Sequence, residues 1–288
     1  MHNGCDLDWC ALVSVERVTS YSAEDGRSVG RFLGLSMREV TQPNGPVKLE
    51  AQSRVQSAVL DQHGFVHAGA LFTMCDCVGG FCGGLGALPD GWVVTTNLMI
   101  RTAPTVVASP LVLNSAVLRR GKTSVVTSIN VVDAVGAFVA AGTLTSAILV
   151  PSDGIAQWDR PARLDMPSEV GGIHFDDWLG ISIRDGAVSI ELTDELRNPW
   201  GIMHGGATSA LVDRGAVEAV THTTGVRERL RTNHVVLHFL APAKIGPVRA
   251  SGRVLGTRPD GYLVEVEVFD EGSDNRLVAL AVATVAVV

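Results

Sequence analysis

This chain contains one unit of sequence twice, and that repeat constrains its fold more than any other feature. Four blocks recur in the same order. They are FLGLSMRE (32–39) with WLGISIRD (178–185), GFVHAGALFTMCD (64–76) with GIMHGGATSALVD (201–213), TTNLMIRTAP (95–104) with TNHVVLHFLAP (232–242), and the apolar runs that end each copy. The spacing from His67 to His204 equals the spacing from Asp76 to Asp213. Such a repeat predicts two copies of one structural unit.

Each copy shows the same pattern of predicted elements. Two short strands lead to a loop that ends in Gly-x-x-His, and a helix follows, over 69–85 in the first copy and 205–221 in the second. In the second copy, later strands are predicted from alternating or continuous apolar runs at 233–241, 246–258, 261–271 and 276–288. The last run is apolar almost throughout, which favours a strand that is central or covered on both faces. One helix on a curved antiparallel sheet is an α+β arrangement.

The copies and the segments outside them set the predicted domain boundaries. The first copy spans 26–150 and the second spans 173–288. Between them, 151–172 is rich in Pro, Asp and Gly and lacks an apolar period, so we expect a linker. The segment 1–25 matches nothing in the second copy and forms an N-terminal extension.

Composition excludes several function classes. The formal net charge is −7 and aromatic residues make up only 5% of the chain, which argues against nucleic-acid binding. The start of the sequence lacks the basic and apolar regions of a signal peptide. The C-terminal apolar run, 277–288, is too short for a membrane helix, so we expect neither membrane insertion nor export.

The five cysteines point to a reducing compartment. An odd number, with Cys75, Cys77 and Cys82 crowded together, is a poor disulfide framework and favours a cytoplasmic location. The C-x-C-x4-C spacing lacks a second pair of ligands, so small buried thiols are expected and a metal site is not.

The pair Gly205-Gly206 stands where a helix is predicted to begin. Backbone N–H groups at a helix N-terminus are unpaired and lie at the positive end of the dipole. Glycine has no side chain to keep a carbonyl oxygen away. The pair therefore predicts an oxyanion hole for a tetrahedral intermediate, with tight helix packing as the alternative.

Asp213 cannot serve the glycines of its own helix. It lies about 13 Å along the helix from His204 and on roughly the opposite face. Two antiparallel helices related by a pseudo-two-fold axis would instead bring Asp213 to His67 and Gly69, and Asp76 to His204. We therefore expect composite sites, each with a carboxylate from one copy and a helix N-terminus from the other.

The motifs resemble those of the hotdog-fold acyl-CoA thioesterases of the PaaI type. The second copy carries the pattern N-x-x-G-x-x-H-G-G-x6-D, followed by T, F-L-x-P and G, as Asn198, Gly201, His204, Gly205, Gly206, Asp213, Thr232, Phe239, Leu240, Pro242 and Gly246. The first copy departs from it, with Asp61 in place of Asn, Ala68 in place of the first Gly, and IRTAP in place of HFLAP. The resemblance implies a tandem hotdog that hydrolyses acyl-CoA without a cofactor and assembles into a homo-oligomer, a dimer of double hotdogs.

The resemblance also suggests roles at the first site. Asp76 would activate water or attack the thioester directly, and the N–H groups of Gly205 and Gly206 would hold the oxyanion. Asn198 and His204 would orient the thioester or the water, although a histidine at a helix entrance can also simply cap it. Thr95 or Thr96 would lie near Asp76, with Thr96 assigned to catalysis and Thr95 to substrate binding.

A second site would combine residues that are equivalent by the repeat. They are Asp213 and Thr232 from the second copy with Asp61, His67 and Gly69 from the first. Asp61 would add a second carboxylate there, and we expect the first site to be the more complete. The cluster LRRGKTS offers Arg119, Arg120 and Lys122 to the phosphates of CoA, or forms a charged hairpin turn.

Two other functions stay open at this point. A hotdog protein that binds acyl-CoA without turnover would share the pocket and tolerate loss of the Asp roles. A hotdog hydratase or dehydratase is less favoured, because the G-D-x-N-P-x-H motif of the hydratases and the paired His and Glu of the dehydratases are absent.

Overall fold

Two helices of equal length form the centre of the molecule. The computed structural model describes residues 28–61, 63–150, 160–166, 168, 172–226 and 229–288, so the expected N-terminal extension 1–25 lies outside the described residues. Helix α3 spans Ala68–Ala87 and helix α5 spans Gly205–Thr224, 20 residues each. Their first residues are equivalent by the repeat, and so are their last. The two predicted helices are confirmed, and each runs slightly beyond its predicted end.

The described strands form one continuous antiparallel sheet of 13 strands, in the order β7-β1-β2-β4-β5-β6-β3-β10-β13-β12-β11-β9-β8. The strands of the first repeat are β1 (Leu35–Glu39), β2 (Lys48–Ser53), β3 (Trp92–Thr102), β4 (Leu111–Arg120), β5 (Ser124–Val132) and β6 (Phe138–Leu149). Those of the second are β8 (Ser182–Arg184), β9 (Ala187–Ile190), β10 (Leu230–Phe239), β11 (Val248–Arg258), β12 (Gly261–Asp270) and β13 (Arg276–Val287). The second half of the order mirrors the first, and the apolar β13 is central, as predicted.

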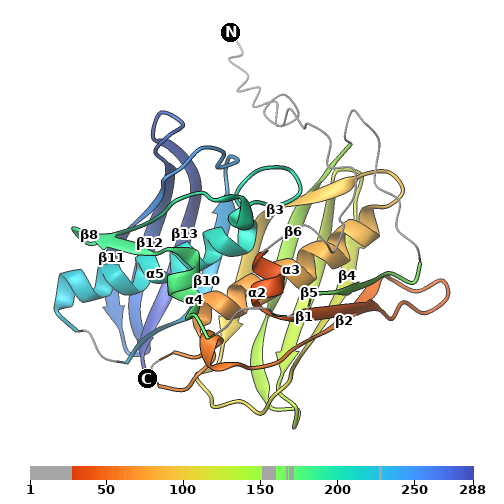
Figure 1. Ribbon diagram of the computed structural model, residues 1–288, viewed down its shortest axis with the longest axis horizontal. Coiled ribbons are helices and arrows are strands. Elements are labelled where there is room, and N and C mark those ends of the chain that lie inside the picture. The colour runs from red at the N-terminus through yellow and green to blue at the C-terminus, as the bar shows by residue number, and fades with distance from the viewer. Residues whose placement is uncertain (1–27, 62, 151–159, 167, 169–171, 227–228) are drawn as a thin grey trace.

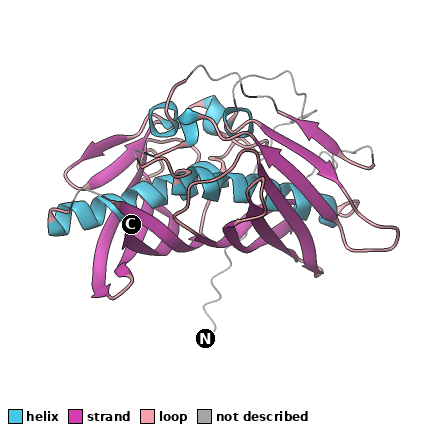
Figure 2. Cartoon of the chain, turned by 90° about the horizontal axis from the view of Figure 1, so that it is seen from below, coloured by secondary structure: helices cyan, strands magenta, loops and turns pink. Residues whose placement is uncertain are grey.

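The repeats meet where β3 pairs with β10. At this junction Met99 lies opposite Val236, which is its own counterpart in the second repeat. A pseudo-two-fold axis therefore passes between these two residues. The long helices lie along the curved sheet on its inner side, as Figure 1 and Figure 2 show.

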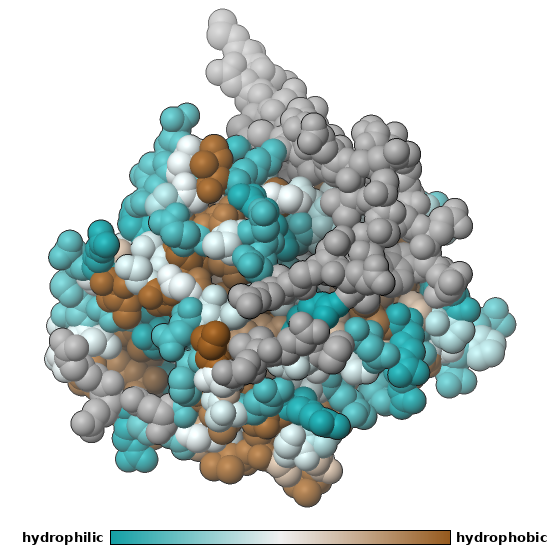
Figure 3. All heavy atoms as spheres, viewed as in Figure 1, coloured by the Kyte–Doolittle hydropathy of each residue, from teal (hydrophilic) through white to brown (hydrophobic). Residues whose placement is uncertain are grey.

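Most side chains of α3 are buried. By length and composition α3 is the one described helix that could cross a membrane, but 83% of its apolar window is buried inside the fold. The face drawn in Figure 3 shows hydrophilic residues interspersed with small apolar areas. The apolar character of α3 is thus accounted for by its place in the core.

The helices touch at their N-terminal ends, and only small residues fit there. A Cβ atom added to Gly69 would lie 3.1 Å from the Cα atom of Ala210, and one added to Gly206 would lie 3.0 Å from the Cα atom of Thr73. The Thr73 hydroxyl donates to the carbonyl oxygens of Gly69 (2.7 Å) and Gly206 (2.9 Å). This contact fixes each helix N-terminus beside the other helix.

Three short elements were not predicted from the sequence. Helices α2 (Val29–Phe32) and α4 (Phe175–Leu179) open the two repeats, and Figure 1 draws them in front of α3 and α5. The expected linker 151–172 contributes strand β7 (Arg163–Asp165), which pairs with β1 because Leu164 is buried against the core. Two 3-10 turns, Ser57–Val59 and Asp194–Leu196, precede the loops that enter the long helices.

Candidate active site

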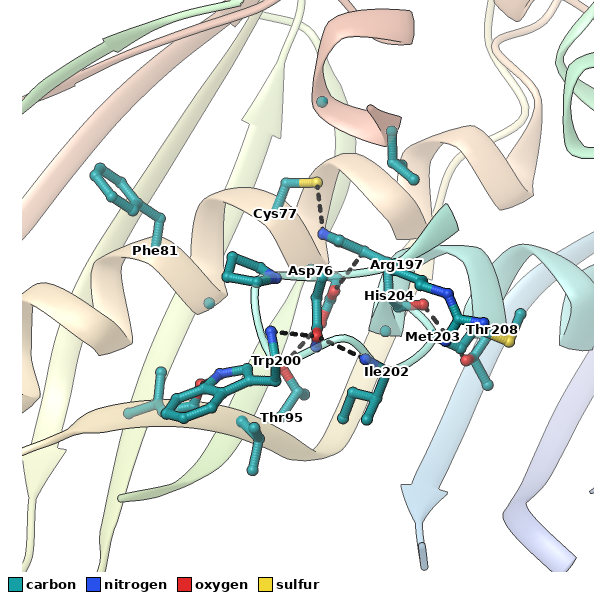
Figure 4. A pocket seen from close by; sticks show the side chains of 18 of the residues that line it. Asp76, Cys77, Phe81, Thr95, Arg197, Trp200, Ile202, Met203, His204 and Thr208 are labelled. Atoms are coloured by element: carbon teal, nitrogen blue, oxygen red, sulfur yellow. Dashed lines mark hydrogen bonds and ion pairs between the residues drawn. The ribbon is translucent and has the colours of Figure 1, made fainter. Parts of the chain in front are cut away.

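A pocket of about 160 Å³ lies between α3 of the first repeat and the N-terminus of α5 of the second (Figure 4). The first repeat contributes Asp76 and Thr95 to its lining, and the second contributes Asn198, His204 and Gly205. All five are residues that the repeat predicts at one composite site. The crossing of the two helices brings them together.

Asp76 lies at the floor of this pocket with only 5% of its surface exposed. Its Oδ1 atom accepts a hydrogen bond from the Thr95 hydroxyl at 2.9 Å. Its Oδ2 atom lies 3.5 Å from Nδ1 of His204. Burial raises the pKa of the Asp76 carboxyl, and the nearby His204 ring and the hydrogen bonds from Thr95 and the Gly206 N–H offset only part of that rise.

His204 caps α5 and is neutral. Its Nδ1 atom accepts the Gly206 N–H at 2.9 Å, so the ring proton of the neutral form is on Nε2, which faces the Cys77 thiol at 3.7 Å. Burial lowers the pKa of His204, against the raising effect of Asp76. The capping role foreseen for this histidine is present, and the ring also lines the pocket.

The two glycines at the start of α5 have different environments. The Gly206 N–H is engaged by His204, and it also hydrogen-bonds Asp76. Among the described residues no acceptor takes the Gly205 N–H. A Cβ atom at Gly205 would lie 2.8 Å from Oδ2 of Asp76. The prediction that both N–H groups are open to a ligand is therefore corrected, and Gly205 alone offers a donor beside the carboxylate.

Asn198 shapes the loop that enters α5. Its Oδ1 atom accepts the backbone N–H groups of Trp200 (2.9 Å) and Ile202 (3.4 Å), which leaves its amide group as a donor. The Trp200 indole donates to the carbonyl oxygen of Val93 at 3.3 Å and so ties this loop to the first repeat. Trp200 was not singled out in the sequence.

The prediction for Thr96 is wrong, and Thr95 takes the place beside Asp76. The Thr96 hydroxyl donates to the carbonyl oxygen of Thr145 on β6 at 3.0 Å, and Thr96 does not line the pocket. A bulge between Thr95 and Asn97 interrupts the strict alternation of β3. The period of two could not distinguish the threonines for that reason.

Known proteins support the fold and its class. Residues 201–276 match the thioesterase superfamily. The matched residues lie within the second repeat and include helix α5 and strands β10, β11 and β12.

Solved structures extend the similarity to the tandem arrangement. The chain is similar to the tesB protein of Mycobacterium avium subs paratuberculosis, at 10% identity and a TM-score of 0.57 over 97% of this chain and 98% of that chain. It is similar to a hot dog fold protein of unknown function from Alicyclobacillus acidocaldarius, at 14% identity and 0.56 over 91% and 98%. An acyl-ACP thioesterase from Bacteroides thetaiotaomicron gives 13% and 0.53 over 82% and 96%. At these identities the likeness shows the fold, which is a tandem hotdog.

The second composite site of the tandem hotdog assembles its carboxylate and helix N-terminus as the first does. Oδ2 of Asp213 accepts the Gly69 N–H at 2.9 Å and lies 3.7 Å from Nδ1 of His67. The Gly69 N–H also reaches Nδ1 of His67 at 3.1 Å. The pairing expected for Asp213 is thus present in geometry.

Charged side chains fill the rest of this second site. Arg231, 4% exposed, donates to Oδ2 of Asp61 at 3.0 Å and to the carbonyl oxygen of Val66 at 2.6 Å. Asp61 also holds its own loop, since its Oδ1 atom accepts two backbone N–H groups as Asn198 does in the first site. Asp61 therefore pairs with an arginine and does not offer a second free carboxylate to a substrate.

Helix α4 closes the same site from the other side. Oδ1 of Asp176 lies 3.3 Å from Nε2 of His67, and its Oδ2 lies 3.1 Å from Nε of Arg214. The Phe175 ring packs edge-on against the His67 ring at 5.7 Å. We call Asp61, His67, Asp176, Asp213, Arg214 and Arg231 the second-site ion cluster.

The open site has a smaller or uncharged residue at each equivalent position. The pairs, first site before second, are Gly30 and Asp176, Cys77 and Arg214, Val94 and Arg231, Asn198 and Asp61, and Gly205 and Ala68. The first-site member of every pair lines the open pocket. The ion cluster was not foreseen, although aligning Val94 with Arg231 would have exposed its central member.

The basic cluster of the first repeat does not line the pocket, and Thr232 makes no hydrogen bond to Asp213 among the described residues. Thr232 is fully buried, and neither its hydroxyl nor Oδ1 of Asp213 has a hydrogen-bond partner among the residues described. Arg119, Arg120 and Lys122 lie at the hairpin between β4 and β5, and none lines the pocket. Arg120 pairs with Asp90, so this cluster is the charged turn that was the alternative.

Within the described parts of the chain, no group of three or more His, Cys, Asp or Glu side chains is arranged to hold a metal ion. Cys75, Cys77 and Cys82 are free thiols, and Cys77 alone of the three lines the pocket.

Proposed function

We propose that the open pocket hydrolyses acyl-CoA thioesters to a free acid and CoA. One observation carries this proposal: a buried carboxylate, Asp76, stands beside a backbone donor without a protein acceptor, at Gly205. A thioester carbonyl placed between them would receive a nucleophile from one side and oxyanion stabilisation from the other.

The roles follow from the hydrogen bonds. Asp76 acts as general base on a water or attacks the carbonyl carbon directly, and Thr95 holds the carboxylate in place. The Gly205 N–H donates a hydrogen bond to the developing oxyanion. The Asn198 amide orients the carbonyl or the water. Neutral His204 caps the N-terminus of α5 through its Nδ1 atom, and its Nε2–H faces the Cys77 thiol.

The leaving group needs little help. A thiolate is stable enough to leave without a strong general acid, and the neutral His204 supplies none. The proposed reaction therefore needs one group for acid–base or nucleophilic chemistry, the carboxylate of Asp76.

We assign turnover to the first site alone. In the second site, Arg231 and Asp176 occupy the equivalent space, and Ala68 adds a methyl group where Gly205 has none. A non-catalytic acyl-CoA-binding protein is the competing function, because it would use the same pocket without needing the reactivity of Asp76.

Release of the CoA thiol from a panel of short, medium, long and aromatic acyl-CoAs tests both ideas. Wild type is compared with Asp76→Asn and Asp213→Asn, which keep size and remove one charge. We expect Asp76→Asn to lose at least 100-fold in kcat and Asp213→Asn to stay within about twofold. Equal loss in both variants would contradict the single-site assignment. A silent wild type that still binds the panel would favour the binding function.

Cytoplasmic location and assembly into a dimer of double hotdogs stay predictions. Size-exclusion chromatography with light scattering would test the assembly directly.

A further inference from the structure

Helix α3 contains an unusual number of glycines, and packing explains some of them. A glycine inside a helix costs stability relative to alanine, so each needs a reason. A Cβ atom at Gly79 would lie 2.8 Å from Leu144, and one at Gly84 would lie 2.7 Å from the Trp92 ring. At both positions a side chain would collide with a neighbour.

No such collision explains the glycine at position 80. The nearest atom to a Cβ placed there is the Thr95 hydroxyl oxygen, at 3.9 Å, and Gly80 lines the pocket. The equivalent residue of the second repeat is Val217, whose side chain packs against the core. The helix therefore tolerates a side chain at this position, and what glycine provides is free space in the pocket.

Asp76, Gly80 and Gly84 lie one helical turn apart along one side of α3. With a rise of about 1.5 Å per residue, Gly80 lies about 6 Å and Gly84 about 12 Å beyond Asp76. The Trp92 ring covers Gly84, and the Phe81 ring meets Trp92 edge-on at 6.3 Å. Trp92 thus forms the end wall of a path that starts at the carboxylate and passes over Gly80.

More than half of the residues that line the pocket are apolar. They include Met37, Leu164 and Met166 in addition to the two rings. Arg197 also lines the pocket, but its guanidinium donates to the carbonyl oxygens of Gly201 (2.7 Å) and Lys244 (3.0 Å). The described lining therefore offers no uncommitted cation to a charged acyl tail.

We infer that Gly80 is a specificity-determining residue, and that the substrates are uncharged apolar acyl groups of about six to ten carbons. An extended chain advances about 1.2 Å per bond, so about five bonds reach Gly80 and about ten reach Trp92. This inference rests on the proposed hydrolysis at Asp76. Gly80 leaves the acyl path from Asp76 open, and the Trp92 ring closes its far end.

Two substitutions of opposite effect test the inference on saturated acyl-CoAs from C2 to C16. Gly80→Leu should lower kcat/KM for octanoyl-CoA at least tenfold while leaving butyryl-CoA within about twofold. Trp92→Ala should move the optimum to longer chains. Gly80→Ala, the milder variant, should shift the profile in the direction of Gly80→Leu.

Gly83→Ala is the matched control. It lies on the same helix, does not line the pocket, and a Cβ atom there meets its nearest neighbour at an ordinary 3.7 Å. Its chain-length profile should equal that of wild type, and its melting temperature should rise as that of Gly80→Ala does. A wild-type profile in folded Gly80→Leu would overturn the inference.

A binding measurement separates this inference from the proposed reaction. Trp92 and Trp200 both line the pocket, so their fluorescence reports occupancy by the same acyl-CoAs. If wild type hydrolyses nothing, the proposed function fails, and the chain-length dependence of Kd then tests Gly80 alone. A Kd profile that Gly80→Leu shortens supports the inference, and an unchanged profile refutes it.

Discussion

At the scale of single residues, burial gives equivalent side chains different chemistry. His204 and His67 cap the two long helices in the same way, yet the pKa of His204 is lowered by its burial. His67 is equally buried, but its hydrogen bond to Asp176 and the charges of Asp213 and Asp176 raise its pKa overall. What surrounds a residue, more than its place in the motif, decides what it can do.

The raised pKa of Asp76 predicts the acid limb of the pH profile. Catalysis needs the carboxylate, so kcat/KM should rise with pH through a midpoint above the ordinary aspartate value of about 3.9. Burial lowers the pKa of His204, so an inflection from this ring is expected below the ordinary histidine value of about 6.5 and not at it. A pH–rate profile of wild type measures both.

Asp213→Asn is the control for that profile, because it alters the other site and should retain the same acid limb. A midpoint at or below about 3.9 in wild type would contradict the role of buried Asp76.

Single positions that recur in the repeat were predictable from the sequence, whereas contacts between distant positions were not. The pairing of Asp76 with His204 followed from helix geometry and the constant spacing of the repeat. The pairing of Arg231 with Asp61 joins positions far apart in the sequence and has no local pattern. The sequence could not decide between Thr95 and Thr96, because the bulge between Thr95 and Asn97 leaves no trace in the alternation of TTN.

At the scale of elements, the second-site ion cluster joins α4, α5, β10 and the loop before α3. Its central cation, Arg231, is 4% exposed and faces Asp61 and Asp213. A buried charge that loses its partner is costly, whereas an exposed pair contributes little. The cluster is therefore expected to hold these four elements together.

Arg231→Met should lower the free energy of unfolding by about 3–5 kcal/mol, because it removes the cation from the buried carboxylate of Asp213 and the partly buried carboxylate of Asp61. Urea unfolding measures the change, and kcat/KM of the folded protein should stay within about twofold.

Arg253→Met is the matched control. Arg253 pairs with Glu265 at 2.8 Å, but its side chain is 71% exposed. We therefore expect Arg253→Met to lower the free energy of unfolding by about 1 kcal/mol or less. An equal loss of unfolding free energy in Arg231→Met and Arg253→Met would show that the second-site ion cluster does not hold these elements together.

The short elements were the part of the fold that the sequence could not predict. Helices α2 and α4 have four and five residues, too few to show a helical period. Strand β7 has three residues inside a segment rich in Pro and Asp, and only its pairing with β1 makes it a strand. The long helices and β10 to β13 were predictable because each presents several periods of apolar residues.

At the scale of the whole molecule, nothing in the described parts separates the repeats into independent bodies. The sheet runs through the β3–β10 junction, and the helix N-termini interlock at Gly69 and Gly206. The candidate site itself needs Asp76 from one repeat and Gly205 from the other.

Such continuity predicts one cooperative unfolding transition. Tryptophan fluorescence, with Trp92 in the first repeat and Trp178 and Trp200 in the second, should coincide with far-UV circular dichroism along a urea titration. Two separated transitions would mean that the repeats unfold as domains.

The peptide link between the repeats has a consequence for how such a molecule can change over generations. In a pair of identical chains, any substitution appears on both sides of the symmetry axis, so opening one site for a ligand opens the other, and an arginine that fills one fills both. Once both halves are encoded in tandem, each position mutates alone. Val94 can then remain part of a pocket wall while its counterpart Arg231 becomes a buried cation, and one half of the gene is free to lose reactivity and gain stability.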